Sequence, residues 1–506
     1  MRQRIIAPAV FAATLLLAFP AAAAEPSPGA PGVGDPYYPD YGNGGYDVSH
    51  YDLRLRYQPK NDHLSGTATL LATATQDLSR FNLDFALKVQ SVRVNGHKAH
   101  HETSGAHELV ITPAEPVADG EKMTVVVTYK GTPSKVKVNG FTSWHRTPDG
   151  GVAANEPEIA WWWYPSNDHP TDKATMDVSV AVPDGTQAIS NGVLASKHSR
   201  AGWTRFNWHS AKPKATYLAT LAIGKFDIRK GETDSGIPVI NAYSKDLGPV
   251  AASARASVQR SGEAIEWLQS VFGKYPFKAV GGYVPNTDTS YAIETQTRPF
   301  YSPEDFAGGA NVSVVVHELA HQWYGDCVSV HGWDDIWLNE GFATYAQWMW
   351  SEAQREASAQ ELADYAYASH PADDDFWTVA PGDPGAANQF DAAVYDRGAM
   401  AIQALRHRVG DEDFFRILKG WPKKYRYEDA TVHQFEAYAE KVSGKSLAGL
   451  FETWLFEPSK PETAPGHDAP ASAGTDGKSG ARSAAPQQVP EPANWQQIKA
   501  AQRHGG

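Results

Sequence analysis

The chain has 506 residues, of which 42% are hydrophobic and 20% are charged, and its formal net charge is −13 at pH 7. This length allows two or three domains of ordinary size around a large buried core. The 16 Trp, 22 Tyr and 19 Phe exclude a wholly disordered protein, and the negative charge argues against nucleic-acid binding as the main function. The single cysteine, Cys327, excludes an intrachain disulfide.

The first 24 residues follow the order of charged, apolar and small side chains that is typical of a secretory signal peptide. Arg2 and Arg4 precede an apolar run, and small residues from Ala21 to Ala24 mark the expected cleavage site. The alternative, a membrane anchor, is disfavoured because the run contains prolines and is shorter than the ~20 residues of a spanning helix. We therefore expect residues 1–24 to be removed and the mature protein to be secreted, without stable membrane insertion.

A β-rich domain is predicted for the first half of the mature chain. Residues 25–45 are rich in Pro, Gly, Asp and Tyr and should form an irregular lead-in. From Tyr46 onward, short runs such as 51–57 alternate apolar and polar side chains, and Asn-Gly and Asp-Gly turn pairs separate them. Many short strands at this spacing indicate a mainly antiparallel domain over residues 46–228.

The second half of the chain has helical periodicity. One long amphipathic helix is predicted over residues 252–272. Short strands are expected over 279–284 and 291–297, and helices joined by loops over 312–456. These elements give a helix-rich second domain, residues 229–458, and the fold class is α+β with more than one domain.

The C-terminal segment differs in composition from both domains. Residues 459–506 contain Val489, Trp495 and Ile498 as their only large apolar side chains, and are otherwise rich in Pro, Ala, Gly, Ser and charges. Such a segment should not bury enough apolar surface to become ordered. We therefore predict a disordered tail.

The motif with the clearest chemistry is H-E-x-x-H at residues 317–321. Positions i and i+4 share one face of a helix, so His317 and His321 can bind one metal ion, with Glu318 beside it to serve a bound water. Catalytic zinc takes three protein ligands and keeps one position open. Glu340, which 18 residues separate from His321, is the predicted third ligand. This interval is long enough for the first helix to end, a loop to follow and a second helix to place the Glu340 carboxylate beside the two histidines.

The chain resembles the zinc aminopeptidases of the aminopeptidase N and leukotriene A4 hydrolase family, which are gluzincin metallopeptidases. The strings that carry the likeness are H-E-L-A-H-Q-W-Y-G-D (317–326), W-L-N-E-G-F-A (337–343), G-K-Y-P-F (273–277) and Y-D-R-G-A-M (395–400). The resemblance extends over about 46–457. It implies that a thermolysin-like, mostly helical zinc domain follows the β-rich domain, without the large C-terminal helical domain of many relatives.

The resemblance also implies roles for individual residues. One Zn²⁺ per chain is expected on His317, His321 and Glu340. Glu318 should accept the proton of the attacking water and pass it to the leaving amine. Tyr395, in the Y-D-R-G segment, should donate a hydrogen bond to the developing oxyanion.

An aminopeptidase must also hold the free α-amine of its substrate, and a carboxylate does so by a charge-assisted hydrogen bond. Glu294, in Y-A-I-E-T, matches the acid of the family's Gly-Ala-Met-Glu-Asn stretch, where an edge strand would also contact the peptide. Glu156, nine residues before Pro165, is the predicted second amine contact, with Glu158 as its alternative. The other residues of this stretch depart from the family pattern, so the sequence does not predict the preferred substrate residue.

The sequence thus predicts a secreted zinc aminopeptidase, acting as a monomer on peptides with a free N-terminus. Two alternatives stay open. One is the epoxide hydrolase-like activity of the same family. The other is an aromatic-rich binding protein without catalysis, because three successive tryptophans, expected on a strand, could stack on sugars: Trp161, Trp162 and Trp163. The complete ligand set argues against an inactive binder, and we interpret Cys327 as a small buried residue, not a ligand.

Overall fold

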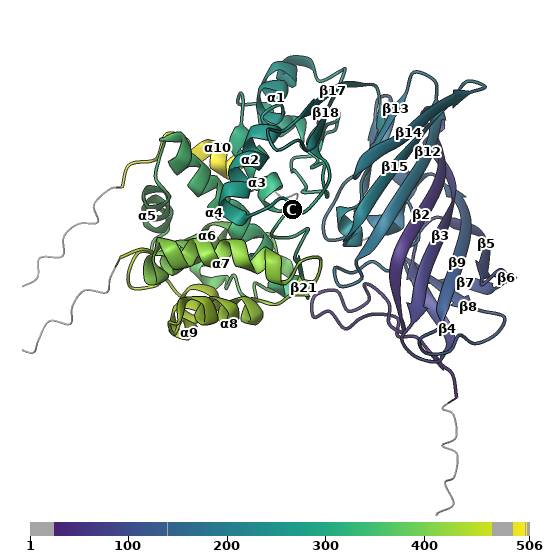
Figure 1. Cartoon of the computed structure of the whole chain (residues 1–506), viewed down its shortest axis with the longest axis horizontal. Helices are drawn as coiled ribbons and strands as arrows, with labels where there is room; N and C mark the ends of the chain where they lie inside the picture. Colours follow the sequence, from purple (N-terminus) through teal and green to yellow (C-terminus); the bar gives the residue numbers. More distant parts are fainter. Residues whose placement is uncertain (1–24, 139, 468–488, 501, 503–506) are drawn as a thin grey trace, which may run out of the picture.

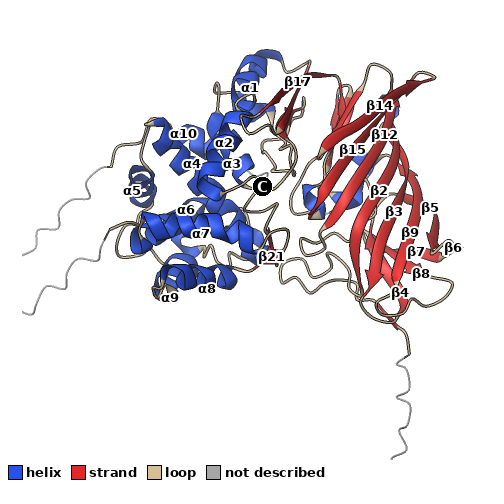
Figure 2. Ribbon diagram, viewed as in Figure 1, coloured by secondary structure: helices blue, strands red, loops and turns tan. Residues whose placement is uncertain are grey.

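The computed structural model describes residues 25–138, 140–467, 489–500 and 502. A β-rich N-terminal part and a mostly helical C-terminal part lie side by side (Figure 1). Figure 2 shows the strands of the first part on one side of the molecule and the helices of the second on the other. This order confirms the predicted fold class. The expected signal peptide, residues 1–24, lies outside the described residues.

An eight-stranded sheet, in the order β14-β15-β12-β2-β3-β9-β5-β6, forms the body of the N-terminal part. Its neighbours pair antiparallel except β12 and β2, which pair in parallel. Along β2 buried and exposed side chains largely alternate, so one face lies in the core. The strands are β2 (Tyr46–Gln58), β3 (His63–Ala74), β5 (Lys88–Val94), β6 (His97–Lys98), β9 (Lys122–Gly131), β12 (Ala174–Pro183), β14 (Val193–Arg200) and β15 (Trp203–Lys214).

Two four-stranded sheets complete this part, in the orders β1-β4-β8-β7 and β10-β11-β16-β13. Their strands are β1 (Ser27–Pro28), β4 (Leu78–Asp84), β7 (His100–Ser104), β8 (Glu108–Thr112), β10 (Trp144–Thr147), β11 (Gly150–Ala153), β13 (Gln187–Ser190) and β16 (Leu221–Gly224).

The three successive tryptophans do not form the expected strand. They lie on and just after a 3-10 turn, η3 (Ala160–Trp162), and none is more than 2% exposed. Their side chains fill the core of the N-terminal part, because indoles bury a large apolar area. No stacked aromatic surface is therefore formed there, and the sugar-binding alternative loses the feature that suggested it.

The lead-in, residues 25–45, is irregular apart from β1 and lies between the two parts. The buried carboxylate of Asp35 accepts a hydrogen bond from the backbone N–H of Trp333 at 2.9 Å and contacts His169 Nε2 at 3.2 Å. Trp333 belongs to the helical part and His169 to the β-rich part. The lead-in therefore joins them at a point close to the helix that carries Glu340.

The helical part begins with a three-stranded sheet, β17 (Phe226–Glu232), β18 (Pro238–Ser244) and β19 (Val280–Val284). The domain boundary expected between residues 228 and 229 falls inside β17. The helices are α1 (Ala251–Val258), α2 (Ser261–Phe272), α3 (Val312–Ala320), α4 (Trp337–Gln354), α5 (Ala359–Ser369), α6 (Ala392–Val409), α7 (Asp411–Lys424), α8 (Val432–Ser443), α9 (Ala448–Phe451) and α10 (Trp495–Ala500), and β20 (Ser329–Val330) pairs with β21 (Asp429–Ala430).

Two local predictions in this part are wrong. The single helix expected over 252–272 is divided into α1 and α2, because the Ser261 hydroxyl donates to the Val258 carbonyl and interrupts the helical pattern. The strand expected over 291–297 is absent, since the chain turns back on itself and only the isolated bridge between Ile293 and Phe300 forms.

The prediction of a disordered tail is wrong for the described residues after 488. Residues 495–500 form α10, and Trp495 and Ile498 are buried in the core of the helical part. The segment is ordered by apolar surface that the other helices of this part provide, which its own composition does not reveal. Residues 468–488 lie outside the described residues.

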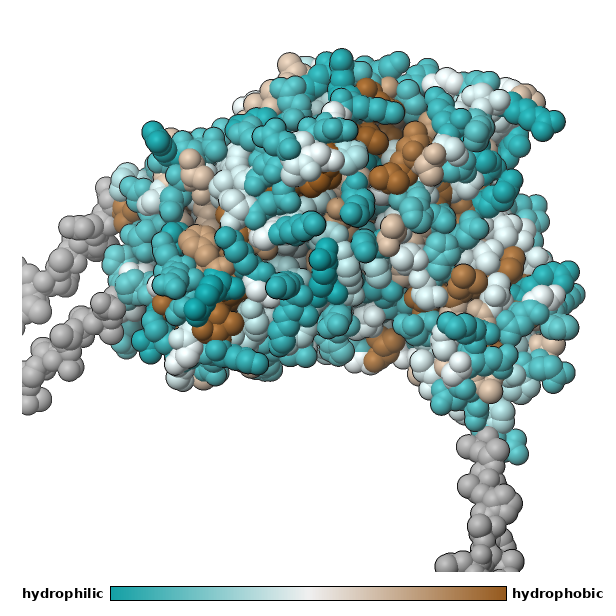
Figure 3. All heavy atoms as spheres, in the orientation of Figure 1, coloured by the Kyte–Doolittle hydropathy of each residue, from teal (hydrophilic) through white to brown (hydrophobic). Residues whose placement is uncertain are grey.

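The surface is mostly polar. On the face in Figure 3, hydrophobic residues are scattered among hydrophilic ones. Among the described residues, the large apolar side chains that are exposed are Val33, Leu71 and Phe141. No helix in the described ranges combines the length and the hydropathy that crossing a bilayer requires.

Candidate active site

Helix α3 brings the two histidines of the H-E-x-x-H motif together. It begins at an N-cap, Asn311, whose side-chain oxygen accepts hydrogen bonds from the backbone N–H groups of Ser313 and Val314. His317 lies in its last turn and His321 follows as its C-cap, with ring centroids 4.9 Å apart. The two histidines therefore lie on one face of the helix, as their i, i+4 spacing predicts.

Glu340 comes back to these histidines on the first turn of α4. Its Oε2 lies 3.2 Å from His317 Nε2 and 3.6 Å from His321 Nε2. These three residues form a cluster that could hold one metal ion, and each is at most 1% exposed. The structure therefore brings together the three ligands that the sequence predicts.

Both histidines are oriented by hydrogen bonds at the ring nitrogen that faces away from Glu340. His317 Nδ1 lies 3.1 Å from Gln347 Oε1, and His321 Nδ1 lies 3.1 Å from the carbonyl oxygen of Tyr324. A carbonyl can only accept, so each Nδ1 carries the proton and each Nε2 presents a lone pair to the cluster.

The donor set fits zinc. Ligand bonds of about 2.0–2.2 Å at tetrahedral angles place neighbouring donor atoms about 3.3 Å apart, which agrees with the two distances to Glu340. Two neutral imidazoles and one carboxylate also leave a fourth position for water or substrate. A second group of neighbouring side chains that could hold a metal ion contains His321, Glu294 and Glu318. The fourth ligand position therefore faces the residues predicted for catalysis and amine binding.

Tyr395 reaches the same site from helix α6. Its buried ring stacks at 6.1 Å, centroid to centroid, against His317. Helices α6 and α4 approach closely because Gly398 faces Gly341: a Cβ on Gly398 would lie 3.3 Å from Gly341 Cα and 2.7 Å from Trp337 Cδ1. Gly398, one turn from Tyr395, and Gly341, next to Glu340, thus set the distance between Tyr395 and the metal cluster.

The buried guanidinium of Arg397 fixes α6 in a second way. It donates to the backbone carbonyls of Trp377 at 2.8 Å and Trp454 at 2.9 Å, and to others nearby. Burial lowers the pKa of Arg397 to about 10, yet the group stays charged at neutral pH. The Y-D-R-G segment therefore combines one residue in the site with neighbours that hold its helix in place.

Glu294 lies on an irregular loop that is tied to the end of α3. Gln322 donates from Nε2 to the Glu294 carbonyl at 3.0 Å and accepts at Oε1 from the Thr297 N–H at 2.7 Å. The Tyr217 hydroxyl hydrogen-bonds the Glu294 carboxylate, whose Oε1 has no partner among the described residues. Burial, and next the charge of Glu340, raise the pKa of Glu294 to about 8.

Of the two candidates for the second amine contact, the structure places Glu156 in the site. Burial raises the pKa of Glu156 well above its usual range, and the next causes are the charges of Glu294, Glu340 and Glu318. Both carboxylate oxygens of Glu156 are buried without a hydrogen-bond partner in the described part of the chain. Glu158, in contrast, hydrogen-bonds Tyr41 and lies away from this cluster.

The site is a concentration of buried acids. Burial raises the pKa of Glu318 well above its usual range, and the carboxylates of Glu294 and Glu340 add to the effect. Asp326, which follows the motif, is buried nearby, where burial and next the charge of Glu294 raise the pKa of its carboxyl group well above its usual range. Like charges at this density repel one another, so the site favours cationic ligands such as a metal ion and an ammonium group.

The sequence analysis missed several residues that shape this site. Gln347 is seven positions after Glu340 on α4, and this two-turn spacing could have identified it. Tyr217 comes from the β-rich part, on the 3-10 turn η4 (Thr216–Leu218), and no sequence pattern links it to Glu294. Asp326 belongs to the string H-E-L-A-H-Q-W-Y-G-D, and only the fold shows that its carboxylate lies near Glu294.

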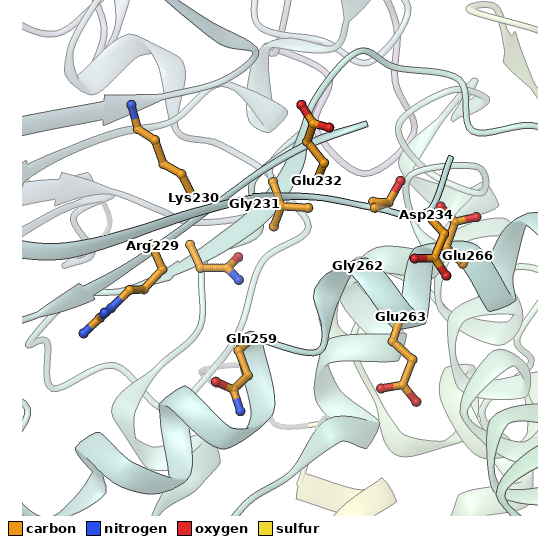
Figure 4. Close-up of a pocket in the computed structure, with 12 residues that line it drawn as sticks. Arg229, Lys230, Gly231, Glu232, Asp234, Gln259, Gly262, Glu263 and Glu266 are labelled. Atoms are coloured by element: carbon orange, nitrogen blue, oxygen red, sulfur yellow. The ribbon is translucent and has the colours of Figure 1, made fainter. Parts of the chain in front are cut away.

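A separate surface pocket of about 450 Å³ lies between β17 and α2 and shares no lining residue with the site (Figure 4). Two of the four acids that line it have partners within the chain. Glu263 pairs with Arg260 at 2.6 Å, and Glu266 accepts from the Ser235 N–H at 2.7 Å. The other two acids, Glu232 and Asp234, are exposed, so this pocket lacks the buried carboxylates that distinguish the site.

Comparison with known families identifies both parts of the chain. The family model described as "Peptidase family M1 domain" matches residues 307–454, and "Peptidase M1 N-terminal domain" matches residues 48–218. All three predicted zinc ligands, Glu318 and Tyr395 lie inside the first match. Glu156 lies inside the second, and Glu294 lies between the two.

Several known proteins are similar. Aminopeptidase M1-C of Oryza sativa subsp. japonica is 27% identical over 59% of this chain and 36% of its own length, and human glutamyl aminopeptidase is 27% identical over 62% and 35%. The alignments thus span about a third of these curated relatives. The solved M1 zinc metallopeptidase from Deinococcus radiodurans is 28% identical, covers 87% of this chain and 100% of its own, and gives a TM-score of 0.77. A mutant of it bound to a Tyr-Ser-Ala substrate is 29% identical, with coverages of 86% and 99% and a TM-score of 0.77.

Proposed function

Because the chain belongs to peptidase family M1, we propose that it is a secreted zinc aminopeptidase that removes N-terminal residues from peptides. The observation that carries this proposal is the position of two buried, incompletely paired carboxylates, Glu156 and Glu294, beside the cluster of His317, His321 and Glu340. The similar proteins named aminopeptidases, and the related structure with a bound tripeptide, support it.

The metal ligands are His317, His321 and Glu340. When bound, Zn²⁺ lowers the pKa of a coordinated water and polarises the peptide carbonyl. Glu318 takes the proton from the attacking water and delivers it to the nitrogen of the leaving amine. A carboxylate in buried surroundings holds that proton well, because burial raises the pKa of Glu318.

Tyr395 donates its hydroxyl hydrogen to the oxygen that becomes negative as the carbonyl carbon turns tetrahedral. Its neighbours on α6 are fixed by backbone bonds and by the close contact at Gly398, so the donor is held before the charge develops. Preorganised donors of this kind stabilise the transition state more than the ground state. Burial, and next Glu340, raise the pKa of Tyr395, so the phenol keeps its proton at neutral pH.

Glu156 and Glu294 restrict the enzyme to free N-termini. A substrate ammonium supplies the hydrogen bonds that Glu156 and the Oε1 of Glu294 lack, and its positive charge stabilises both carboxylates. A peptide with a blocked N-terminus would leave Glu156 and the Oε1 of Glu294 buried without hydrogen bonds, which is costly. The free amine therefore sets the position of the first peptide bond relative to the zinc ligands.

The test is hydrolysis of aminoacyl chromophore substrates with and without a zinc chelator. We expect release from substrates with a free α-amine, loss of release on chelation, recovery on adding Zn²⁺, and no release from the N-acetylated forms. Activity confined to N-acetylated peptides would contradict the proposal. Hydrolysis of an epoxide with no action on aminoacyl substrates would favour the other activity of the family.

Secretion is tested separately by the fate of residues 1–24. Their charged, apolar and small-residue order supports export. We expect the protein to be recovered outside the cytoplasm with Glu25 as its first residue, as measured by mass spectrometry of the intact chain. Recovery in the cytoplasm with residues 1–24 retained would contradict this part of the proposal.

A further inference from the structure

Helix α10 packs against the part of the molecule that carries the active site, although it is far from it in the sequence. Figure 1 shows α10, in yellow, beside the helices of the catalytic part, and it contacts α3. Ile498 is fully buried, Trp495 is 7% exposed, and the Trp495 ring packs edge-on against Tyr365 at 5.1 Å. Burial of these two side chains gives the segment a defined place on the fold.

The first helix held by α10 is α3, which carries His317 and Glu318. Asn311 caps the start of α3 through its side-chain oxygen, and its Nδ2 donates to the Gln497 carbonyl at 3.1 Å. The same amide therefore bonds the helix start on one side and α10 on the other. This fixes the position of the first turn of α3 relative to α10.

The second is α4, which carries Glu340. Gln347 Nε2 donates to the Ser313 hydroxyl at 2.8 Å and to the Ile498 carbonyl at 3.4 Å. Because the Ile498 carbonyl can only accept, it must face the Nε2 of Gln347. The Gln347 side-chain amide is therefore oriented with Oε1 toward His317 Nδ1. Through Gln347, Ile498 thus selects the ring nitrogen of His317 that faces the metal cluster.

The third is α6, which carries Tyr395. The adjacent residue, Asp396, is 1% exposed, and tail residues bond both of its carboxylate oxygens. Lys499 Nζ donates to Oδ2 at 2.6 Å, and Gln502 Nε2 donates to Oδ1 at 2.7 Å. Without these partners a buried carboxylate would be left uncompensated one residue from Tyr395, and α6 would have to move or admit water.

We propose that α10 is a clamp that positions the active site: it holds the three helices that bear the zinc ligands, the general base and the oxyanion donor. Ile498, Lys499 and Gln502 are positioning residues, because they act through Gln347 and Asp396 and do not touch the reacting atoms. Residues 495–500 and Gln502 supply the clamp. It accounts for the order of a segment whose composition indicates disorder.

The experiment compares full-length variants. Ile498→Asp places a charge at a fully buried position and detaches α10. Lys499→Met removes the charged one of the two tail partners of Asp396, and Lys499→Arg keeps the charge. Gln496→Ala is the matched control, because Gln496 is exposed on the same helix and bonds only Glu491. Each variant is measured for kcat and KM, for Zn²⁺ affinity by competition with a chelating dye, and for hydrogen exchange of residues 495–500.

We expect Ile498→Asp to lower both kcat and Zn²⁺ affinity by roughly 10- to 100-fold while KM changes little, as for other residues that orient metal ligands. Lys499→Met should lower kcat but leave Zn²⁺ affinity unchanged, and Lys499→Arg should restore kcat. A peptide of residues 489–506, added to Ile498→Asp, should recover part of the lost activity. If exchange shows that α10 is detached while kcat and Zn²⁺ affinity equal those of Gln496→Ala, the clamp is refuted.

This inference rests on the proposed function for its kinetic readout only. If the wild-type protein hydrolyses no aminoacyl substrate, the proposed function fails, while Zn²⁺ affinity and hydrogen exchange still test the clamp. If Ile498→Asp does not fold, the two Lys499 variants provide the test. Lys499→Met cannot form the ion pair with Asp396, so a kcat equal to that of the wild type would refute the clamp at α6.

Discussion

The two halves of the active site are built differently. In the metal half, His317, His321 and Glu340 lie on two successive helices, and each histidine has an orienting partner at Nδ1. In the amine half, Glu156 and Glu294 come from loops that are far apart in the sequence, and neither carboxylate is fully hydrogen-bonded. The metal half is thus arranged by the chain itself, whereas under the proposed function the ammonium group of the substrate completes the amine half. The following predictions test this difference, from the largest expected effect to the smallest.

Glu318→Gln should have the largest effect. It removes the proton acceptor but keeps the shape of the side chain, so we expect kcat to fall by roughly 10²- to 10⁴-fold, with KM little changed. The Zn²⁺ content, measured by atomic emission, should remain one ion per chain because Glu318 is not a ligand. Loss of the metal in this variant would place Glu318 among the ligands and contradict the assigned roles.

Tyr395→Phe should come next. The ring that stacks on His317 is kept and only the donor to the oxyanion is lost, so we expect kcat to fall by about 10²- to 10³-fold. Binding of an uncharged ground-state analogue should not change, as measured by calorimetry. A rise in KM with unchanged kcat would show that Tyr395 binds substrate and does not stabilise the transition state.

Glu156→Gln tests the amine half. Loss of one charge-assisted hydrogen bond should lower kcat/KM for substrates with a free amine by roughly 10- to 100-fold. Unlike a change in the metal half, it should also raise the melting temperature of the ligand-free protein, because a buried acid without partners destabilises the fold. Glu158→Gln is the matched control and should leave kcat/KM unchanged, since Glu158 lies toward Tyr41. Equal losses in both variants would contradict the choice of Glu156.

Gly398→Ala should have the smallest effect on chemistry and a clear effect on stability. The new methyl group would lie 2.7 Å from the buried Trp337 ring, so α6 and α4 must separate slightly. We expect the free energy of unfolding to fall by about 1–3 kcal/mol, measured by denaturant titration, with a modest loss of kcat from the displaced Tyr395. Gly410→Ala, just beyond the end of α6, cannot serve as the control. A Cβ there would meet no neighbouring atom, but the φ of 87° at Gly410 strains any alanine. Ala392→Gly at the helix start changes propensity only and should cost less.

Much of the fold and of the metal half was predictable, because it depends on local patterns. The i, i+4 spacing of His317 and His321 places both on one face of α3, and the interval to Glu340 matches a helix, a loop and a second helix. Alternating side chains likewise marked strands such as β2. The division between α1 and α2, and the absence of a strand over 291–297, were not predictable, because side-chain bonding to the backbone and a chain reversal override local periodicity there.

By itself, the sequence determined the order of a β-rich and a helical part and the three residues of the metal cluster, with Glu318 beside them. It did so because helical and strand periods are properties of neighbouring residues. Only the tertiary structure brings Glu156, and not Glu158, among the carboxylates of the site, adds Tyr217 and Gln347 to it, and orders residues 495–500 as α10. Each of these depends on where a loop or a tail meets a distant surface, and the stabilising contacts exist only once the other part has folded.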